Sequence, residues 1–362
     1  MFDKKTVKDI DVKDQVVLVR ADYNMPLVTQ EDGKVKVGND FRMKESLPTL
    51  KYLLENGAKK IVIISHLGRP KGQRDEKLSL KVAAEHLQKL LPEVTVGFVD
   101  ECRGEKVEQV VEEMPEGSIL VLENLRFEPG EEENDAEFAE DIVRSTGATV
   151  FVQDGFAVTH RAHASTVGLA KLLPAVAGLL VEKEVNLLTK SLENPEHPLI
   201  VIIGGAKVAD KQPLIDKFLP VADRLIIGGK LAADGYQTEA EQVYVAEDFD
   251  EDGEGVKLDV GPIATCKITD MVKGAKTVVW NGVLGKVEDP AYATASVILA
   301  KELGENDKVT SIICGGDTSG FVENMQENNP ELKYTLLSTG GGAALELLAG
   351  AKMPGLEALE GK

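Results

Sequence analysis

Short runs of apolar and β-branched residues alternate along the chain with longer segments whose apolar residues recur at helical spacing. Continuous apolar runs are typical of strands buried on both faces of a parallel sheet, and segments such as 46–56 and 79–91 predict the helices that cover it. The pattern therefore predicts an α/β protein. The predicted strands are 16–20, 61–65, 94–99, 119–123 and 149–153 in the first half, and 199–205, 224–229, 277–282, 311–316 and 335–342 in the second.

A chain of 362 residues is long for a single hydrophobic core, and its predicted strands fall into two series. The sequence therefore predicts two doubly wound parallel-sheet domains. Between the series, residues 175–198 are helical in pattern to about Leu192 and are then interrupted by Pro195 and Pro198. We interpret this segment as a linking helix and a turn; the alternative is a helix inside one domain. The expected parts are a first domain at 1–174, a linking helix at 175–194 and a second domain at 195–345.

Composition and charge narrow the class of protein. The formal net charge of −20 disfavours a general binder of nucleic acid or of an acidic membrane, so any attraction for an anion must be local. The three cysteines, Cys102, Cys266 and Cys314, are scattered and lack CxxC spacing, which argues against a disulfide framework or a zinc site. No apolar run approaches 18 residues and no signal-peptide pattern opens the chain. We expect a cytoplasmic protein with no membrane segment.

Polar clusters follow four of the predicted strands in the first half, where ligands bind in doubly wound sheets. Eight of the nine arginines lie at or before Arg161, and a guanidinium group offers a planar fork for carboxylate and phosphate. The clusters predict a site for a small ligand that carries both groups. They are Arg20–Pro26, Ser65–Pro70, Glu123–Phe127 and Asp154–His163.

Each of these residues also has a simpler interpretation. Arg20 could be an ion-pair residue, and His66 or His163 a structural histidine with satisfied hydrogen bonds. His160 and His163 could bind a metal, but no third ligand has suitable spacing.

In the second half, paired glycines follow the strands and lysines follow the glycines. Gly204-Gly205 precede a helical segment that carries Lys207 and Lys211 four residues apart, an arrangement that suits phosphate at a helix N-terminus. There is no Walker A sequence, and no GxGxxG opens a βαβ unit, so the usual P-loop and dinucleotide folds are not indicated. Asp317 is a candidate Mg²⁺ ligand beside phosphates. The triple glycine 340–342 could also be a tight turn.

Taken together and in order, these motifs resemble those of the phosphoglycerate kinase family, and the similarity runs essentially end to end. The alternative of a generic α/β sugar-phosphate enzyme does not account for the motif order. The motifs are VLVRADYNMP (17–26), SHLGRPKG (65–72), LENLRF (122–127), HRAHAS (160–165), GGAKVADK (204–211), VVWNG (278–282), GGDT (315–318) and STGGGAALE (338–346).

The resemblance implies a phosphotransferase with a carboxyl group as acceptor, which moves a phosphoryl group from 1,3-bisphosphoglycerate to ADP, with Mg²⁺, and gives 3-phosphoglycerate and ATP. It implies that Arg42 and Lys207 flank the transferred group and that Asp317 holds the metal. The residues that match the family's phosphoglycerate positions are Asp22, Asn24, Arg42, His66, Arg69, Arg126 and Arg161. Those on the nucleotide side are Lys207, Lys211, Asn281, Glu288, Gly315, Gly316, Asp317 and Thr318, with Glu288 on the ribose hydroxyls.

The resemblance also implies that a tail at about 346–362 returns to the first, phosphoglycerate-binding domain, and that 195–345 bind the nucleotide. We expect a monomer that closes about a hinge near 175–198, because the acyl phosphate must be kept from water. The alternative is a catalytically silent relative that acts as a binding or regulatory module.

The chain departs from the family mainly on the nucleotide side. Residues 229–258 are acidic and predict mostly loop, with one short strand at 242–246, and the region after Lys230 is a few dozen residues shorter than the family norm. Val283 and Cys314 stand where the family usually has proline and glycine. We therefore expect a weak or relaxed base preference, with ADP still favoured.

Overall fold

The structure is a computed structural model that describes residues 2–30, 33, 35–205 and 208–362. The chain divides into two compact units. The first unit contains Phe2–Lys183 and Lys352–Lys362, and the second contains Glu184–Ala351. Helix α6 (Leu179–Glu193) contributes residues to both. Each unit has a six-stranded parallel sheet, which confirms the predicted α/β fold class.

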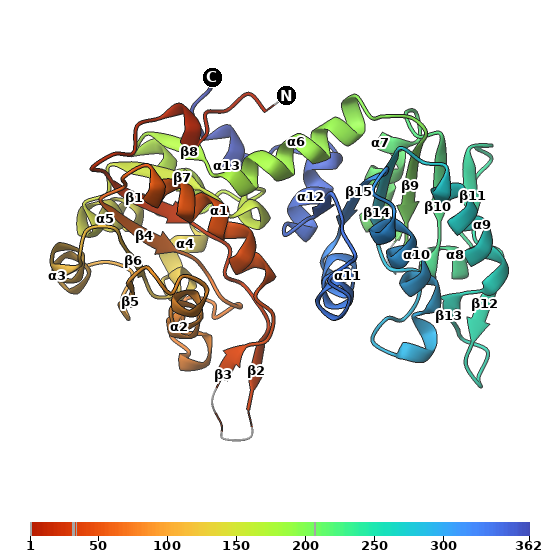
Figure 1. Cartoon of the computed structure of the whole chain (residues 1–362), viewed down its shortest axis with the longest axis horizontal. Coiled ribbons are helices and arrows are strands. Elements are labelled where there is room, and N and C mark those ends of the chain that lie inside the picture. Colours follow the sequence, from red (N-terminus) through yellow and green to blue (C-terminus); the bar gives the residue numbers. More distant parts are fainter. Residues whose placement is uncertain (1, 31–32, 34, 206–207) are drawn as a thin grey trace. The chain divides into compact units, whose positions relative to one another are not determined.

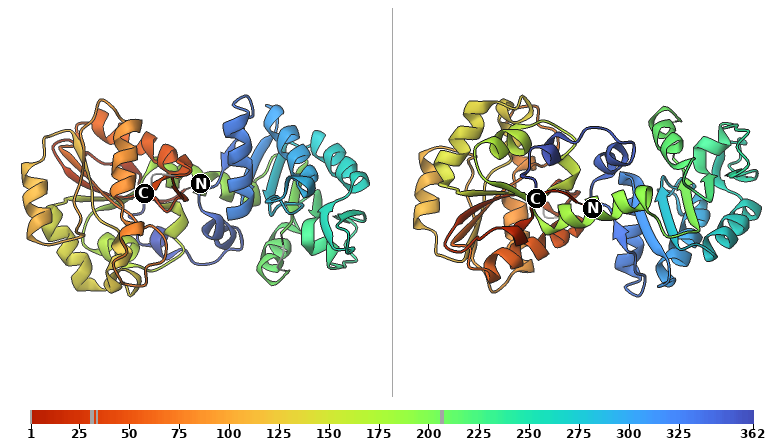
Figure 2. Two further views of the ribbon diagram at one scale, coloured as in Figure 1. Left: turned by 90° about the horizontal axis from the view of Figure 1, so that it is seen from below. Right: turned by 90° about the horizontal axis from the view of Figure 1, so that it is seen from above.

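The sheet of the first unit has the order β5-β6-β4-β1-β7-β8, and every neighbouring pair is parallel. Helices lie on both faces of this sheet (Figures 1 and 2). The chain leaves β1 toward β4 and later returns to its other side at β7, so the order reverses at β1. The strands are β1 (Val16–Arg20), β2 (Leu27–Thr29), β3 (Val35–Val37), β4 (Lys60–Ile64), β5 (Val96–Phe98), β6 (Ser118–Val121), β7 (Val150–Gln153) and β8 (Ala175–Ala177). The α-helices are α1 (Phe41–Glu55), α2 (Lys81–Leu90), α3 (Glu105–Glu113), α4 (Pro129–Glu132), α5 (Ala136–Thr146) and α13 (Pro354–Glu357).

The sheet of the second unit has the order β11-β10-β9-β14-β15-β16 and is also parallel. Its order reverses between β9 and β14. The strands are β9 (Leu199–Ile203), β10 (Arg224–Ile227), β11 (Val243–Val245), β12 (Phe249–Glu251), β13 (Lys257–Val260), β14 (Thr277–Asn281), β15 (Thr310–Cys314) and β16 (Leu336–Leu337). The remaining helices are α7 (Val208–Phe218), α8 (Gly229–Ala233), α9 (Pro262–Lys273), α10 (Thr294–Glu305), α11 (Gly316–Asn328) and α12 (Gly341–Leu348).

The apolar runs form the strands because both of their faces are buried. Val19 of β1 and Ile63 of β4 belong to one buried cluster with Leu50 of α1 and Leu87 of α2. Full burial of such a side chain contributes about 1.5–3 kcal/mol, so the covering helices hold the strand ends in fixed positions.

Several elements differ from the sequence-based prediction. The segment 175–194, expected as one helix, begins as strand β8, which pairs with β7, and becomes helical only at Leu179. Gly178 separates the two, because a side chain there would meet the carboxyl group of Asp154. The antiparallel hairpins β2–β3 and β12–β13 were not predicted. The short strand expected at 242–246 is confirmed as β11, which pairs with β10.

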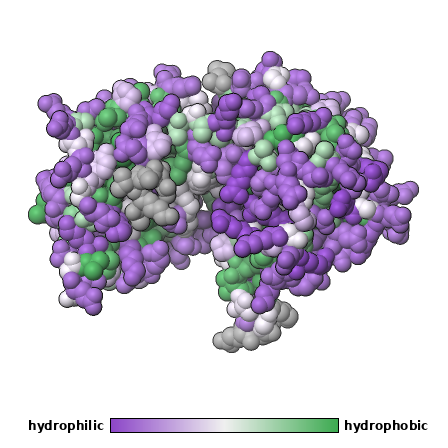
Figure 3. Space-filling view, turned by 180° about the vertical axis from the view of Figure 1, so that it is seen from behind, coloured by the Kyte–Doolittle hydropathy of each residue, from purple (hydrophilic) through white to green (hydrophobic). Residues whose placement is uncertain are grey.

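The molecular surface is largely hydrophilic on the face that Figure 3 shows. Hydrophilic residues cover most of the face shown in Figure 3, and hydrophobic ones are scattered among them. Among the described residues, no helix is both long enough and apolar enough to cross a membrane.

Candidate functional site

The loop that follows β1 is tied to the loop that follows β4. Ser65 Oγ accepts the N–H of Tyr23 at 2.8 Å, and Asn24 Oδ1 accepts the N–H of Gly68 at 2.9 Å. Asp22 Oδ1 accepts the N–H of Asn24 at 3.1 Å. Because β1 lies where the strand order reverses, both loops meet at the sheet edge where doubly wound folds bind ligands.

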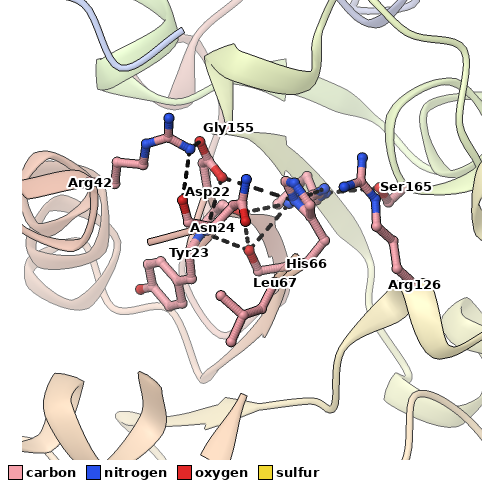
Figure 4. Close-up of polar contacts among 12 residues, drawn as sticks. Asp22, Tyr23, Asn24, Arg42, His66, Leu67, Arg126, Gly155 and Ser165 are labelled. Atoms are coloured by element: carbon pink, nitrogen blue, oxygen red, sulfur yellow. Dashed lines mark hydrogen bonds and ion pairs between the residues drawn. The ribbon is translucent and has the colours of Figure 1, made fainter. Parts of the chain in front are cut away.

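Arg42, from the first turn of α1, is held against these loops (Figure 4). Its Nη1 lies 2.7 Å from Asp22 Oδ2 and donates to Asn24 O at 3.0 Å. The Asp22 side chain is 1% exposed and that of Arg42 is 28% exposed, so the pair is anchored on its buried side and open on the other. A guanidinium group held in this way is oriented before any ligand arrives.

Arg126 is fixed by the loop that follows β6. Asn124 Oδ1 accepts the N–H of Arg126 at 3.1 Å, and Arg126 Nη1 donates to Gly68 O at 2.9 Å. Burial lowers the pKa of Arg126; the nearby charges of Arg20 and Arg161 act in the same direction, and those of Glu132 and Glu131 oppose them. An arginine stays protonated despite such a shift, so Arg126 keeps its positive charge here, with its Nε 3.1 Å from Glu132 Oε1.

His66 is 3% exposed and is the second residue after β4. Its Nδ1 lies 3.1 Å from Nη2 of Arg20, a side chain with no solvent exposure. Burial, followed by the charges of Arg20, Arg126 and Arg42, lowers the pKa of His66 well below its usual value. Arg20 is therefore more than the isolated ion-pair residue that its sequence position allowed.

The other two predicted arginines are less enclosed. Arg69 is exposed and follows Gly68, whose carbonyl accepts from Arg126. Arg161 is half-buried, and its Nε donates to His160 Nε2 at 3.0 Å. The structure thus gathers Asp22, Asn24, Arg42, His66 and Arg126 in one network, with Arg69 and Arg161 beside it.

Sequence reasoning missed the residues that support this network. Ser165 Oγ donates to Glu131 Oε1 at 2.6 Å and accepts from Arg20 Nε at 2.8 Å. Glu131 has no solvent exposure, although it lies in an acidic run that is typical of a solvated surface. Ser165 stands in the HRAHAS motif, so motif context was the available signal for it; Glu131 had none.

In the second unit, backbone groups replace side chains at the sheet edge. Gly204 N–H donates to Asn281 O at 2.9 Å and Gly205 N–H to Val283 O at 3.0 Å. A side chain at Gly204 would collide with the carbonyl oxygens of Gly282 and Val283, so only glycine permits this approach. The loops that follow β9 and β14 are therefore in backbone contact at the reversal point of the second sheet.

Five predicted nucleotide-side residues surround the end of β14. Lys211 Nζ donates to Asn281 Oδ1, and Asn281 Nδ2 donates to Cys314 Sγ at 3.4 Å. Thr318 Oγ1 accepts the N–H of Gly282 at 2.8 Å. Gly315 has a positive φ of 101° and begins helix α11 together with Gly316. Lys207 lies outside the described residues.

A cavity of about 320 Å³ opens beside this edge within the second unit. Two of the predicted residues, Glu288 and Asp317, lie on its wall, and both are exposed. The hairpin β12–β13 supplies Phe249 and Leu258, so it forms an apolar wall that the sequence analysis did not foresee. The described lining residues are Gly205, Gly229, Lys230, Ala233, Phe249, Lys257, Leu258, Asp259, Val283, Leu284, Gly285, Lys286, Glu288 and Asp317.

The donor set of this cavity suits a metal that arrives with phosphates. In the described part of the chain, no group of three or more His, Cys, Asp or Glu side chains could hold a metal ion. Asp317, in the first turn of α11, instead offers one exposed carboxylate at the cavity wall. Mg²⁺ commonly takes one or two carboxylates and completes its shell with phosphate oxygens and water, so Asp317 fits that role.

Comparison with known proteins identifies the relatives of this chain. The family model described as phosphoglycerate kinase matches residues 7–243 and 232–351. The curated phosphoglycerate kinase of Fervidobacterium nodosum is 38% identical over an alignment of 409 positions, which covers 100% of this chain and 99% of the relative. The alignment is longer than the 362 residues of this chain, so the relative has positions without a counterpart here.

Solved structures give the same result. The structure of phosphoglycerate kinase from Coxiella burnetii matches with a TM-score of 0.76 at 30% identity, over 98% of each chain. The crystal structure of phosphoglycerate kinase from Pyrococcus horikoshii matches with a TM-score of 0.83 at 28% identity, over 99% of this chain and 98% of that one.

Proposed function

This chain belongs to the phosphoglycerate kinase family, and from that premise we propose how its residues divide the work of the reaction. The enzyme is a phosphotransferase of glycolysis that moves a phosphoryl group between the carboxyl group of 3-phosphoglycerate and ADP or ATP. In the first unit, Asp22, Asn24 and Arg42 bind phosphoglycerate together with His66, Arg69, Arg126 and Arg161. The observation that carries this assignment is the network in which Arg42, His66 and Arg126 are already oriented around one sheet edge.

In the second unit, we assign the cavity to the nucleotide. Its glycine-lined edge leaves room for a polyphosphate, and its apolar wall suits a base. Glu288 would hold the ribose, and Lys211, Asn281, Thr318 and the N-terminus of α11 at Gly315–Gly316 would order the phosphate loops. Lys207 and Arg42 would flank the transferred group.

A loose phosphoryl transition state needs in-line positioning and neutralised charge more than covalent chemistry. Mg²⁺, when bound at Asp317 with the nucleotide phosphates, would supply part of that neutralisation. The reacting groups must also meet away from water, so the function includes a closing movement about 175–198. Small-angle scattering should show compaction when both substrates are present.

The three free cysteines support a reducing, cytoplasmic location, and we propose that the enzyme acts as a monomer. Light scattering at assay concentration would test the oligomeric state.

A coupled assay that follows ADP formation from ATP and 3-phosphoglycerate tests the function. We expect turnover that depends on both substrates and on Mg²⁺. No turnover in the folded wild-type protein would favour the alternative, a silent relative that binds one ligand, which calorimetry with 3-phosphoglycerate would then detect.

A further inference from the structure

Arg20 uses its guanidinium group entirely inside the protein. Nε donates to Ser165 Oγ at 2.8 Å, and Nη1 donates to Ala21 O at 2.6 Å. Nη2 points at the ring of His66, 3.1 Å from Nδ1. The side chain has no solvent exposure, so its charge is not available to a substrate directly. A fully buried arginine beside a binding histidine therefore needs a role of another kind.

The chemistry of the contact fixes the proton on His66. A guanidinium group has five N–H donors and no acceptor, so the hydrogen bond forms only if Nδ1 presents its lone pair. The ring must then be neutral, with its proton on Nε2. An imidazolium ring, or the other tautomer, would place two N–H groups against each other.

The cations around His66 also favour its neutral form. Asp22 Oδ1 is 4.0 Å from Nδ1, yet the carboxylate of Asp22 is engaged by Arg42 and by the N–H of Asn24. Burial and the surrounding cations lower the pKa of His66 well below its usual value. The charged and titratable groups that face the ring are Arg20 at the end of β1, Asp22 after it, Arg42 of α1, Arg126 after β6, and His163 before the short helix 164–168.

Glu131 holds Arg20 in the orientation that this contact requires. It accepts the Ser165 hydroxyl at 2.6 Å and the Ser165 N–H at 3.0 Å, so the hydroxyl proton faces Glu131 and the oxygen lone pair faces Arg20 Nε. A chain of hydrogen bonds thus runs from Glu131 through Ser165 and Arg20 to His66. Each member is buried, and each has one arrangement that satisfies its partners.

We propose that Arg20 is a positioning residue, which locks His66 as a neutral ring whose Nε2–H is offered to an anionic oxygen of phosphoglycerate. Among the described residues no hydrogen bond occupies Nε2, so this N–H is free for the substrate. The proposal rests on the assignment of His66 to the phosphoglycerate site. Its consequence is that His66 contributes a fixed neutral donor, and that phosphoglycerate binding gains nothing from acid in the range where a histidine ordinarily titrates.

Nitrogen NMR of the full-length enzyme labelled at histidine tests the proton position directly. The His66 signals are assigned by their loss in His66→Gln. We expect the neutral Nε2–H pattern in the wild-type protein from about pH 5.5 to 8, the range in which an ordinary histidine changes charge. A proton on Nδ1, or a ring that titrates near its ordinary value, would overturn the proposal.

The variant Arg20→Gln tests the positioning role, because an amide can both donate and accept and no longer dictates the tautomer. We expect His66 to titrate in this variant and the KM for 3-phosphoglycerate to be roughly fivefold lower at pH 6 than at pH 8, since a charged donor binds an anion more strongly than a neutral one. The ratio of the two KM values, measured also in the double variant Arg20→Gln/His66→Gln, corrects for titration of the substrate. Equal ratios in the two proteins would contradict the role of Arg20.

The two ideas fail separately. If the folded wild-type protein is inactive, the proposed function is contradicted, but the NMR experiment still reports the tautomer of His66. An active wild-type enzyme with a titrating His66 would remove this inference alone. If Arg20→Gln does not fold, the wild-type NMR remains decisive.

Discussion

The candidate sites of the two units would contact an anion through different kinds of groups. In the first unit, the candidate site is built from side chains that are buried and hold one another, as Arg20, His66 and Glu131 do. In the second unit, backbone approaches at Gly204 and Gly282 shape the edge, and lysines line an open cavity. In the first arrangement, the position of each side chain depends on its neighbours. In the second, a side chain on the cavity wall can be substituted without disturbing the backbone contacts.

This difference explains where the chain departs from its family. In the first unit, removing one partner of a buried charged pair would leave the other uncompensated, so we expect its site to tolerate little change. The departures that the resemblance implies at Val283 and Cys314 lie in the second unit, where the Val283 carbonyl still accepts the N–H of Gly205. Cys314 even supplies an acceptor for the Asn281 amide.

The largest expected effect is on kcat, and it should distinguish a variant in the first unit from one in the second. Arg42→Ala should lower kcat by roughly 10³-fold, because a positioned arginine at a phosphoryl group commonly contributes 10³–10⁵. Glu288→Ala, an exposed residue on the cavity wall, should raise the KM for ADP by about tenfold or less, the loss of one or two hydrogen bonds. Steady-state kinetics measure both. Comparable losses in kcat for the two variants would break the comparison.

Stability should show the dependence within the first unit. Glu131→Gln removes the larger of the two negative charges that act on buried Arg20, those of Glu131 and Asp22, and should lower the free energy of unfolding by about 3–5 kcal/mol. The matched control is Glu133→Gln, an exposed residue in the same segment, for which we expect a change of about 0.5 kcal/mol or less. Urea denaturation measures both. Similar small losses would mean that the buried network does not support the fold.

Buried carboxyl groups give a smaller, pH-dependent contrast. Burial raises the pKa of Asp154 to about 8 in the first unit and that of Asp259 to about 6 in the second. Each group binds a proton in the folded state that it has lost in the unfolded state, so stability falls as pH rises from about 4 toward the folded pKa, by up to about 1.4 kcal/mol per pH unit. The window should extend to about pH 8 for Asp154 and end near pH 6 for Asp259.

The variants Asp154→Asn and Asp259→Asn should each flatten the slope in their own window, because asparagine cannot ionise. Asp154→Asn retains an oxygen acceptor for the N–H of Leu180. Asp259 accepts the N–H groups of both Val260 and Ala295, so Asp259→Asn keeps an acceptor for one of them and should also lower stability at every pH. Urea denaturation midpoints from pH 4 to 9 test this. An unchanged slope in Asp154→Asn would show that this carboxyl is ionised in the folded protein.

The sequence predicted the elements whose signal is local. The apolar run 16–20 coincides with β1. The polar clusters predicted after the strands contained Asp22, which pairs with Arg42, and both members of the Arg20–His66 contact. Strand β8 escaped detection because its three residues, Ala175–Ala177, are too few to show a period. Glu131 escaped because its role depends on Ser165, 34 residues away, and on burial that no local pattern reveals.

The smallest effect concerns the nucleotide base. The cavity presents Phe249 and Leu258 as apolar walls and Lys257 above the Phe249 ring, with Nζ 4.6 Å from its centroid. Apolar walls bind any purine, and a lysine donor suits the C6 carbonyl of guanine or hypoxanthine but not the C6 amino group of adenine. Family membership favours ADP, and a donor that suits the other purines should narrow this preference, so we expect kcat/KM for ADP to exceed that for GDP or IDP by about tenfold or less, which corresponds to about 1.4 kcal/mol.

Steady-state kinetics with ADP, GDP and IDP measure this ratio, and two variants locate its cause. Phe249→Ala removes the wall shared by all purines and should lower kcat/KM for each nucleotide by a similar factor. Lys257→Met keeps the apolar stem but removes the donor, so it should selectively disfavour GDP and IDP. A site built to hydrogen-bond the adenine amino group would instead reject the other bases by 10⁴-fold or more. Such a sharp preference for ADP would show that the second unit is as tightly specified as the first.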